Sequence, residues 1–178
     1  YLSNEGREEF AWTTSWGVST RLVGALIMTH SDDDDLVLPP KLAPQQVVIL
    51  PIYRNDEEGG PVLEYCHKLH GELATQTYDN APVRVLVDTR DIPRADKKWQ
   101  HVKRGVPVIV EVGPRDIQGD TLMPKRRDES SAEKKPAVSR SQFVSSISTQ
   151  LAAMQANLYS RALAYREENT RTFTDLAE

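Results

Sequence analysis

The apolar residues of this chain gather in short runs, and the most regular run opens the segment at residues 105–116, GVPVIVEVGPRD. A Val- and Ile-rich run bounded by Gly and Pro is typical of a strand buried on both faces, in the middle of a mainly parallel sheet. Arg115 and Asp116 follow it directly. Because ligands of open α/β sheets bind at strand ends, this pair is a candidate ligand contact. The alternative is that the pair only caps the strand and forms a local ion pair.

The apolar run at residues 46–52 predicts a second buried strand, and a third apolar run, at 83–87, predicts another strand. Between them, a predicted turn at 56–60 precedes apolar residues that recur at helical spacing from Val62 to about Gln76. A shorter helical stretch covers residues 99–104. Strand, helix, strand, helix, strand in this order predicts a βαβαβ unit with right-handed crossovers.

The last part of the chain predicts edge strands and one long helix. Short apolar runs at 121–123 and 137–138 predict two edge strands joined by a polar loop at 128–135. They complete an α/β fold, a mixed, mainly parallel five-stranded sheet flanked by helices. An apolar stripe from about residue 140 to 169 predicts an amphipathic helix that covers one face of the sheet, with a coiled-coil seam as the alternative.

The beginning of the chain carries a different pattern. Residues 10–16 alternate aromatic or apolar with small polar residues and predict a short strand that ends at Gly17. A helix is then predicted, capped by Ser19 or Thr20. Arg21 in its first turn would lie beside free backbone N–H groups and is a candidate phosphate ligand. The alternative is an arginine that reaches from a buried helix to solvent.

An acidic run and a proline-rich segment separate this beginning from the sheet. Residues 31–35 predict a solvated loop rather than a metal site, because neighbouring side chains converge on one ion only in a shaped loop. Three prolines stiffen residues 36–44, which indicates a semi-rigid linker between two domains, with its apolar residues docked on one of them.

Composition narrows the class of protein. The 178 residues, 39% hydrophobic, suffice for a buried core, and a net charge of −4 gives no overall nucleic-acid signature. The single cysteine, Cys66, excludes an internal disulfide and a cysteine-based zinc site, and its place on an apolar helix face predicts a core residue. No apolar stretch approaches the roughly 20 residues that span a bilayer, and no signal-peptide pattern opens the chain. We expect a cytoplasmic protein, and the missing initiator Met suggests a fragment.

Positive charge is concentrated locally. Residues 84–104 hold seven basic residues against three acidic ones, and Lys125, Arg126 and Arg127 form a second cluster. Lysine and arginine supply sequence-independent affinity for phosphates, and Trp99 could stack on a base, so an RNA loop is a candidate ligand. The alternative is a solvated helix face. The candidate RNA contacts are Arg90, Arg94, Lys97, Arg115, Asp116 and Arg127.

Three segments resemble the prolyl-tRNA synthetases of the archaeal and eukaryotic type, a class II aminoacyl-tRNA synthetase family. They are WTTSWGVSTRLVGALIMTH at residues 12–30, LVLPPKLAP at 36–44 and GVPVIVEVGPRD at 105–116. The resemblance implies the end of a class II catalytic domain at 1–35, a linker at 36–44 and an anticodon-binding domain at 45–138. The helix at 139–178 would lead to a C-terminal domain beyond this chain.

The resemblance also assigns roles to individual residues. Residues 15–21 correspond to motif 3, so Arg21 would be catalytic and would bind the ATP phosphates, with Ser19 nearby. Ser15, Trp16 and Gly17 would line the proline pocket. The implied cofactor is ATP with Mg²⁺, and the implied partners are tRNA(Pro), proline and a second copy of the enzyme. No metal site, membrane contact or anticodon-domain cofactor is implied. Motifs 1 and 2 are absent, so this part alone is not expected to be active.

The chain departs from the family where the anticodon would be read. An ungapped alignment places His101 and Val102 at a Trp-Glu pair and Ile109 at an arginine that read the two guanines of the proline anticodon. The alternative is a two-residue insertion, which would place Trp99 and Gln100 at the Trp-Glu pair but would leave Ile109 at the arginine. Apolar side chains cannot make those hydrogen bonds, which are worth about 1–3 kcal/mol per good pair. We therefore expect weakened anticodon discrimination. A non-catalytic tRNA-binding or accessory module of the same fold is the alternative function.

Overall fold

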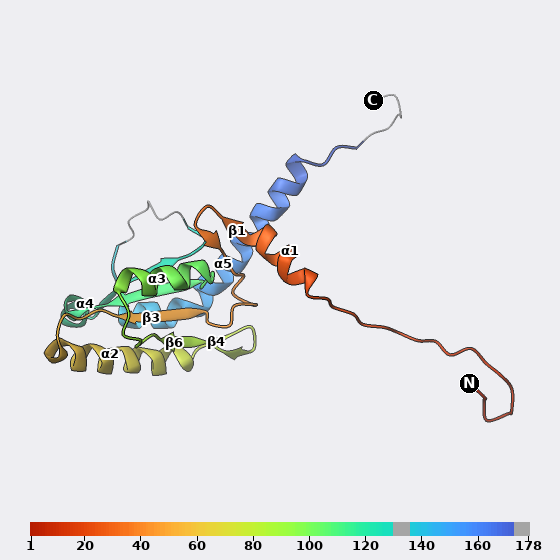
Figure 1. Cartoon of the computed structure of the whole chain (residues 1–178), viewed down its shortest axis with the longest axis horizontal. Coiled ribbons are helices and arrows are strands. Elements are labelled where there is room, and N and C mark those ends of the chain that lie inside the picture. Colours follow the sequence, from red (N-terminus) through yellow and green to blue (C-terminus); the bar gives the residue numbers. More distant parts are fainter. Residues whose placement is uncertain (130–135, 173–178) are drawn as a thin grey trace.

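The structure is a computed structural model, which describes residues 1–129 and 136–172. A five-stranded sheet in the order β6-β3-β7-β8-β9 forms its centre (Figure 1). Strands β6, β3 and β7 are parallel, whereas β8 is antiparallel to both of its neighbours, β7 and β9. This confirms the predicted mixed sheet. The strands are β3 (Val47–Pro51), β6 (Val85–Val87), β7 (Val108–Val112), β8 (Thr121–Arg126) and β9 (Val138–Ser139).

Strand β7 lies between β3 and β8 and is covered on both faces, as the Val/Ile run predicts. Val108, Val110 and Val112 point into the larger apolar core, and Ile109 points into a smaller core on the other face. This alternation follows from the pleat, which sends successive side chains to opposite faces. Glu111 shares the face of Ile109 and is the only charged residue of the strand.

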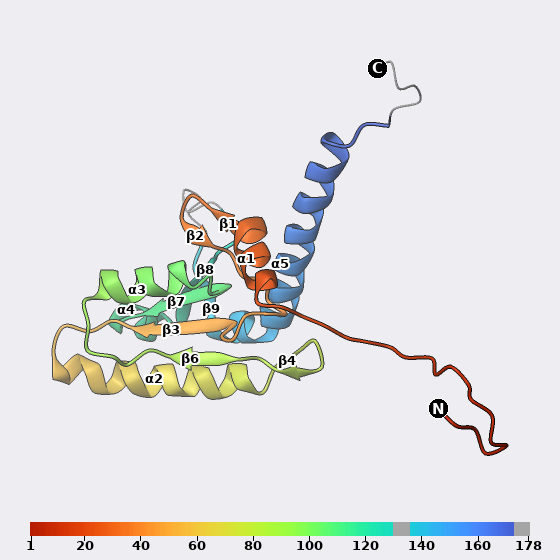
Figure 2. The same cartoon turned by 45° about the vertical axis from the view of Figure 1, so that its right-hand side comes forward.

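Helices cover the two faces unequally (Figure 2). Helices α2 (Asp56–Ala74) and α5 (Arg140–Glu168) pack on the larger core, while α3 (Arg94–Lys103) covers the other face through Val102. Cys66 is fully buried in the larger core, and burial raises the pKa of its thiol to about 12, which confirms it as a core residue. No helix within residues 1–129 and 136–172 is long and apolar enough to cross a membrane.

Three helix predictions need correction. The turn predicted at 56–60 is the first turn of α2, capped by the side chain of Asn55, which accepts a hydrogen bond from the Glu58 backbone N–H at 2.9 Å. Helix α3 begins at Arg94, five residues earlier than predicted. Helix α4 (Pro114–Gly119) was not predicted at all, because Gly113 and Pro114 also signal a turn. Here Pro114 occupies the first helical position, where its missing N–H costs nothing.

The predicted strand at residues 10–16 is wrong. The segment is extended but unpaired and runs away from the sheet (Figure 1), and Trp12 and Trp16 are almost completely exposed. A strand needs a neighbouring strand for its backbone hydrogen bonds, and no described segment pairs with this one. Helix α1 (Arg21–His30) follows, and neither predicted cap residue makes a side-chain cap hydrogen bond at its start.

The acidic run and the linker are more ordered than predicted. Residues 31–36 form a small hairpin of β1 (Ser31–Asp32) and β2 (Asp35–Leu36). The proline-rich segment then docks on the sheet domain, as predicted: the Leu38 backbone N–H donates to the Gly105 carbonyl at 3.1 Å. The guanidinium of Arg84 donates to the carbonyls of Pro40 and Ala43 at 3.1 and 2.9 Å. This arginine, part of the basic block, therefore serves the fold.

Candidate nucleic-acid interface

Arg115 and Asp116 lie at the start of α4, at the carboxyl end of β7. Asp116 accepts a hydrogen bond from the Gly113 backbone N–H at 2.8 Å and thereby caps the helix. Arg115 is exposed and has no ion-pair partner among the residues that the structure describes. Asp116 thus has the capping role of the second alternative, while the guanidinium of Arg115 is available to a ligand, as the first alternative requires.

Arg90 belongs to a network around one buried carboxylate. Asp88, at the end of β6, accepts hydrogen bonds from Arg90 Nε at 2.9 Å and Nη2 at 2.7 Å, and its Oδ2 lies 2.7 Å from His101 Nε2. Asp88 and His101 are almost completely buried. The hydrogen bonds from Arg90, followed by the one from His101, hold the pKa of Asp88 far below its usual range, although burial opposes this shift. The network fastens α3 to the sheet.

Lys97 is also drawn into this network. It is only 9% exposed, and its Nζ lies 3.4 Å from the Asp88 carbonyl oxygen. A buried ammonium that faces the backbone is poorly placed for a phosphate in solvent. Lys97 and Arg90, two of the predicted RNA contacts, are therefore engaged within the protein.

Arg94 binds the carboxylate of Glu111, a residue that was not among the predicted site residues. Its Nε and Nη2 both lie 2.9 Å from Glu111 Oε1, and Lys98 Nζ lies 3.2 Å from Oε2. Burial would raise the pKa of Glu111, but these bonds outweigh it and lower the pKa. The available signals were the glutamate in an otherwise apolar run and the spacing of Arg94 and Lys98, which is one helical turn.

The two apolar departures from the family lie where α3 packs on the sheet. Ile109 is 5% exposed and belongs to the smaller core, against which Val102 packs. Neither side chain can donate or accept a hydrogen bond. Trp99 lies on the outer side of α3, is 46% exposed, and has Lys103 Nζ 5.9 Å from its ring centroid. Trp99 is thus the exposed aromatic surface of this helix.

Arg127 binds the hairpin rather than solvent. Its Nη1 donates to Asp32 Oδ2 at 2.7 Å, Nη2 donates to Asp32 Oδ1, and Nη2 also reaches the Asp35 carbonyl at 3.2 Å. The side chain is only 9% exposed. The hydrogen bonds from Arg127 lower the pKa of Asp32. Arg127 therefore ties the segment that follows α1 to the end of β8.

The residues assigned to motif 3 are not assembled into a pocket in the described structure. Arg21, the first residue of α1, is exposed, and its Nε donates to Ser19 Oγ at 2.9 Å. Ser15, Trp16 and Gly17 lie on the exposed extended segment, and no atom lies within 4 Å of the position that a Cβ would take at Gly17. Arg21 is thus at a helix start, as predicted, and accessible to a phosphate.

Comparison with known proteins identifies the sheet domain. The sequence profile of the family described as "Anticodon binding domain" matches residues 46–150, more than half of the chain. The chain belongs to the anticodon-binding domain family. The profile covers the sheet, α2, α3, α4 and the first part of α5.

Relatives of this anticodon-binding domain protein match the whole chain. It is 53% identical over 178 residues to a proline--tRNA ligase of Bdellovibrio bacteriovorus, 54% to one of Rhodopirellula baltica and 43% to one of Akkermansia muciniphila. All of this chain is covered, but only 36%, 34% and 35% of those relatives, so the chain spans about a third of their length. The resemblance to prolyl-tRNA synthetases is confirmed.

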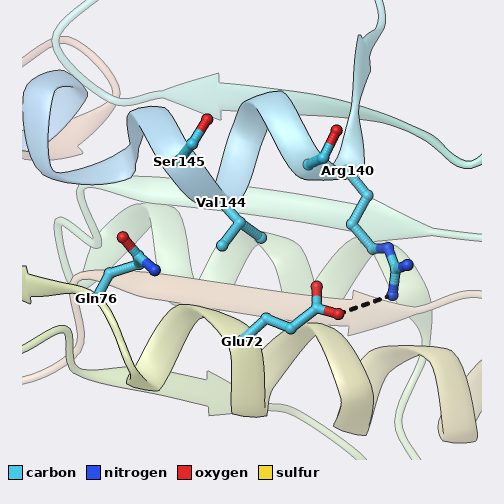
Figure 3. A pocket seen from close by; sticks show the side chains of 6 residues that line it. Glu72, Gln76, Arg140, Val144 and Ser145 are labelled. Atoms are coloured by element: carbon cyan, nitrogen blue, oxygen red, sulfur yellow. Dashed lines mark hydrogen bonds and ion pairs between the residues drawn. The ribbon is translucent and has the colours of Figure 1, made fainter.

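The anticodon-binding domain also has a cavity of about 370 Å³ on its other face, between α2 and the start of α5 (Figure 3). Arg140 and Glu72 face each other across it, with Nη1 and Oε1 3.1 Å apart. Arg140 also binds Asp120 at 3.1 Å and lies over the ring of Tyr65. The ion pair between Arg140 and Glu72 links α5 to α2 across this cavity. Because these two charged groups of the lining bind each other, neither is free to contact RNA.

Proposed function

We propose that this chain is part of a proline--tRNA ligase, in which it binds tRNA(Pro) and supplies one contact to ATP. The observation that carries the proposal is the similarity to proline--tRNA ligases over all 178 residues, including residues 1–45, which the domain profile does not reach. In the proposed division, 1–35 end the catalytic domain, 36–44 form the linker, 45–138 form the anticodon-binding domain and 139–178 lead onward.

The complete enzyme would activate proline by in-line attack of its carboxylate on the α-phosphate of ATP and then transfer it to the 3′ end of tRNA(Pro). Arg21 would bind the ATP phosphates, since it places a fixed and exposed positive charge at the start of a helix. Ser19 holds its Nε and would orient the guanidinium. Ser15, Trp16 and Gly17 would line the proline pocket once the rest of the enzyme packs against them.

The Mg²⁺ that accompanies ATP would be held elsewhere. Within residues 1–129 and 136–172, no three His, Cys, Asp or Glu side chains are grouped so that they could hold a metal ion. Because Mg²⁺ with a nucleotide is usually held by the phosphates and one or two carboxylates, the ATP phosphates would be its main ligands. We propose that the enzyme is a cytoplasmic homodimer, as the family resemblance implies.

The tRNA would bind on the α3 side of the sheet, where Trp99 and the cations around Glu111 face solvent, and would reach Arg115 at the carboxyl end of β7. Because Val102 and Ile109 offer no hydrogen bonds, we propose that this enzyme discriminates the anticodon guanines weakly. Filter binding with the complete enzyme measures this discrimination. A good base contact is worth about 1–3 kcal/mol. Because such contacts are missing here, changing either guanine should weaken the affinity for tRNA(Pro) by less than about tenfold. A hundredfold loss for either change would contradict weak discrimination.

ATP–pyrophosphate exchange by the complete enzyme tests the proposed activity, with proline and alanine compared. Exchange should require proline, and Arg21→Ala should lower it by about 10²–10³-fold, the usual cost of removing one group that stabilises developing charge. Arg7→Ala is the matched control, because Arg7 is exposed on the same segment and pairs with Glu5, another exposed residue of that segment. Equal exchange with alanine, or an unaffected Arg21→Ala enzyme, would contradict the proposal.

The second candidate function is a non-catalytic tRNA-binding module, and the apolar Val102 and Ile109 favour it. Such a protein would bind tRNA without catalysing exchange. The two readouts therefore separate the candidates.

A further inference from the structure

One part of the α3 face carries more positive charge than its neighbours neutralise. Arg94, Lys98 and Lys125 lie around the single carboxylate of Glu111. We call these three cations and Glu111 the lysine notch. Elsewhere in the two clusters, Arg90 pairs with Asp88, Arg126 pairs with Asp128 and Glu129, and Arg127 pairs with Asp32.

The fold itself brings the notch together. Lys125 on β8 lies directly opposite Ile109 on β7, and Glu111 follows two residues along the same strand, so both point to the α3 face. Arg94 and Lys98 are one turn apart on α3 and reach down to Glu111 from above. Three separate elements therefore contribute charged groups to one place.

The positive groups of the notch are incompletely satisfied. Lys98 uses one hydrogen bond on Glu111, and an ammonium has three N–H donors. Lys125 lies beside Lys98, and hydrogen bonding to Lys98, followed by the repulsion of its positive charge, lowers the pKa of Lys125. Two adjacent ammonium groups are unfavourable unless an anion lies between them. Lys98 is 30% exposed in its side chain and Lys125 is exposed, so an anion can reach both.

We propose that Lys98 and Lys125 together bind one phosphate group of an RNA backbone. Glu111 keeps Lys98 directed along the sheet, and Arg94 on the other oxygen of Glu111 adds positive charge at the rim. This inference rests on the proposed function for the identity of the RNA, but it assigns a phosphate site that the comparison with relatives does not provide. A phosphate contact strengthens binding without reading sequence.

The experiment measures the affinity of the complete enzyme for transcribed tRNA(Pro) across a range of salt concentrations. Lys98→Ala, Lys125→Ala and the double variant are compared with Lys68→Ala, the control, which removes an exposed lysine from α2 on the opposite face. Each notch variant should reduce the slope of log K against log salt by about 0.7–0.9, the value for one lost phosphate contact. Lys68→Ala should leave the slope unchanged.

Two further arms identify the ligand chemistry. Transcripts with altered anticodons should be weakened by the same factor in Lys125→Ala, because a phosphate contact is independent of base identity. Inorganic phosphate at concentrations near those of the RNA should not displace it. If the loss of affinity in Lys125→Ala depended on the anticodon base, the notch would read a base and not a phosphate. If inorganic phosphate at such concentrations displaced the RNA, the notch would be a site for free phosphate and not for the RNA backbone.

The outcomes separate this inference from the proposed function. Normal tRNA binding with the same slope in the notch variants as in Lys68→Ala would overturn the inference and leave the proposed function standing. Absence of tRNA binding by the unaltered enzyme would overturn both. Because Lys125 is exposed, Lys125→Ala should unfold at the temperature of the unaltered protein, which shows that a changed slope reports binding rather than misfolding.

Discussion

Replacing Gly105 by alanine should destabilise the protein, because this glycine holds the linker against the sheet domain. Its φ is +69°, and an added Cβ would lie 2.8 Å from the Leu38 backbone N and 2.9 Å from the Leu36 carbonyl oxygen. The left-handed conformation costs a residue with a Cβ about 1–2 kcal/mol. Forcing backbone atoms apart in a packed region costs about 1–3 kcal/mol more. The free energy of unfolding should therefore fall by about 2–5 kcal/mol.

Urea and thermal unfolding followed by circular dichroism measure this change. For a chain of this size about 1 kcal/mol shifts the Tm by roughly 2–4 °C, so the Tm should fall by roughly 4–20 °C. Gly71→Ala is the matched control, because Gly71 lies inside α2 with no atom within 4 Å of an added Cβ. That change should stabilise the protein by about 0.5–1 kcal/mol. If Gly105→Ala proved as stable as the unaltered protein, the linker would not be docked.

Three more predictions follow from the buried groups. Asp88→Ala should cost about 2–3 kcal/mol in urea unfolding, because buried His101 loses its partner. The pKa of Asp88 in the folded protein lies below its unfolded value of 3.8. The stabilisation by Asp88 is therefore complete above pH 3.8 and is lost as the pH falls toward the folded-state pKa. In acid, the difference in stability between Asp88→Ala and the unaltered protein should therefore become smaller. Cys66 should resist a thiol reagent at pH 8 until the protein unfolds. Arg127→Ala should speed hydrogen exchange in the hairpin at 31–36, because the hairpin loses its pair with Asp32. Unchanged exchange would show that this pair does not stabilise the hairpin.

Much of the sheet was predictable because its three parallel strands are apolar runs, although β6 is a partly exposed edge strand. The runs at 46–52, 83–87 and 105–112 each contain a strand, and the long helix at the end lies within two residues of its prediction. The first turn of α2 and all of α4 were missed, since Gly and Pro signal turns as well as helix starts. The strand predicted at 10–16 failed because the pattern is local, whereas a strand depends on a neighbour.

The candidate site was less predictable than the fold, because charged partners come from distant parts of the chain. Arg127 meets Asp32 across 95 residues, and Arg94 meets Glu111 across 17. A count of basic residues cannot distinguish a paired cation from a free one. Arg115 is exposed, as a ligand contact requires, whereas Arg94 and Lys98 are paired with Glu111.

Hydrogen exchange of the complete enzyme, with and without tRNA(Pro), tests most directly where the RNA binds. We expect tRNA to slow exchange in α3, in β8 and at the start of α4, where Lys98, Lys125 and Arg115 lie. Exchange in α2, on the opposite face, should stay the same. Protection confined to α2 and the start of α5, around Glu72 and Arg140, would contradict an RNA surface on the α3 side of the sheet.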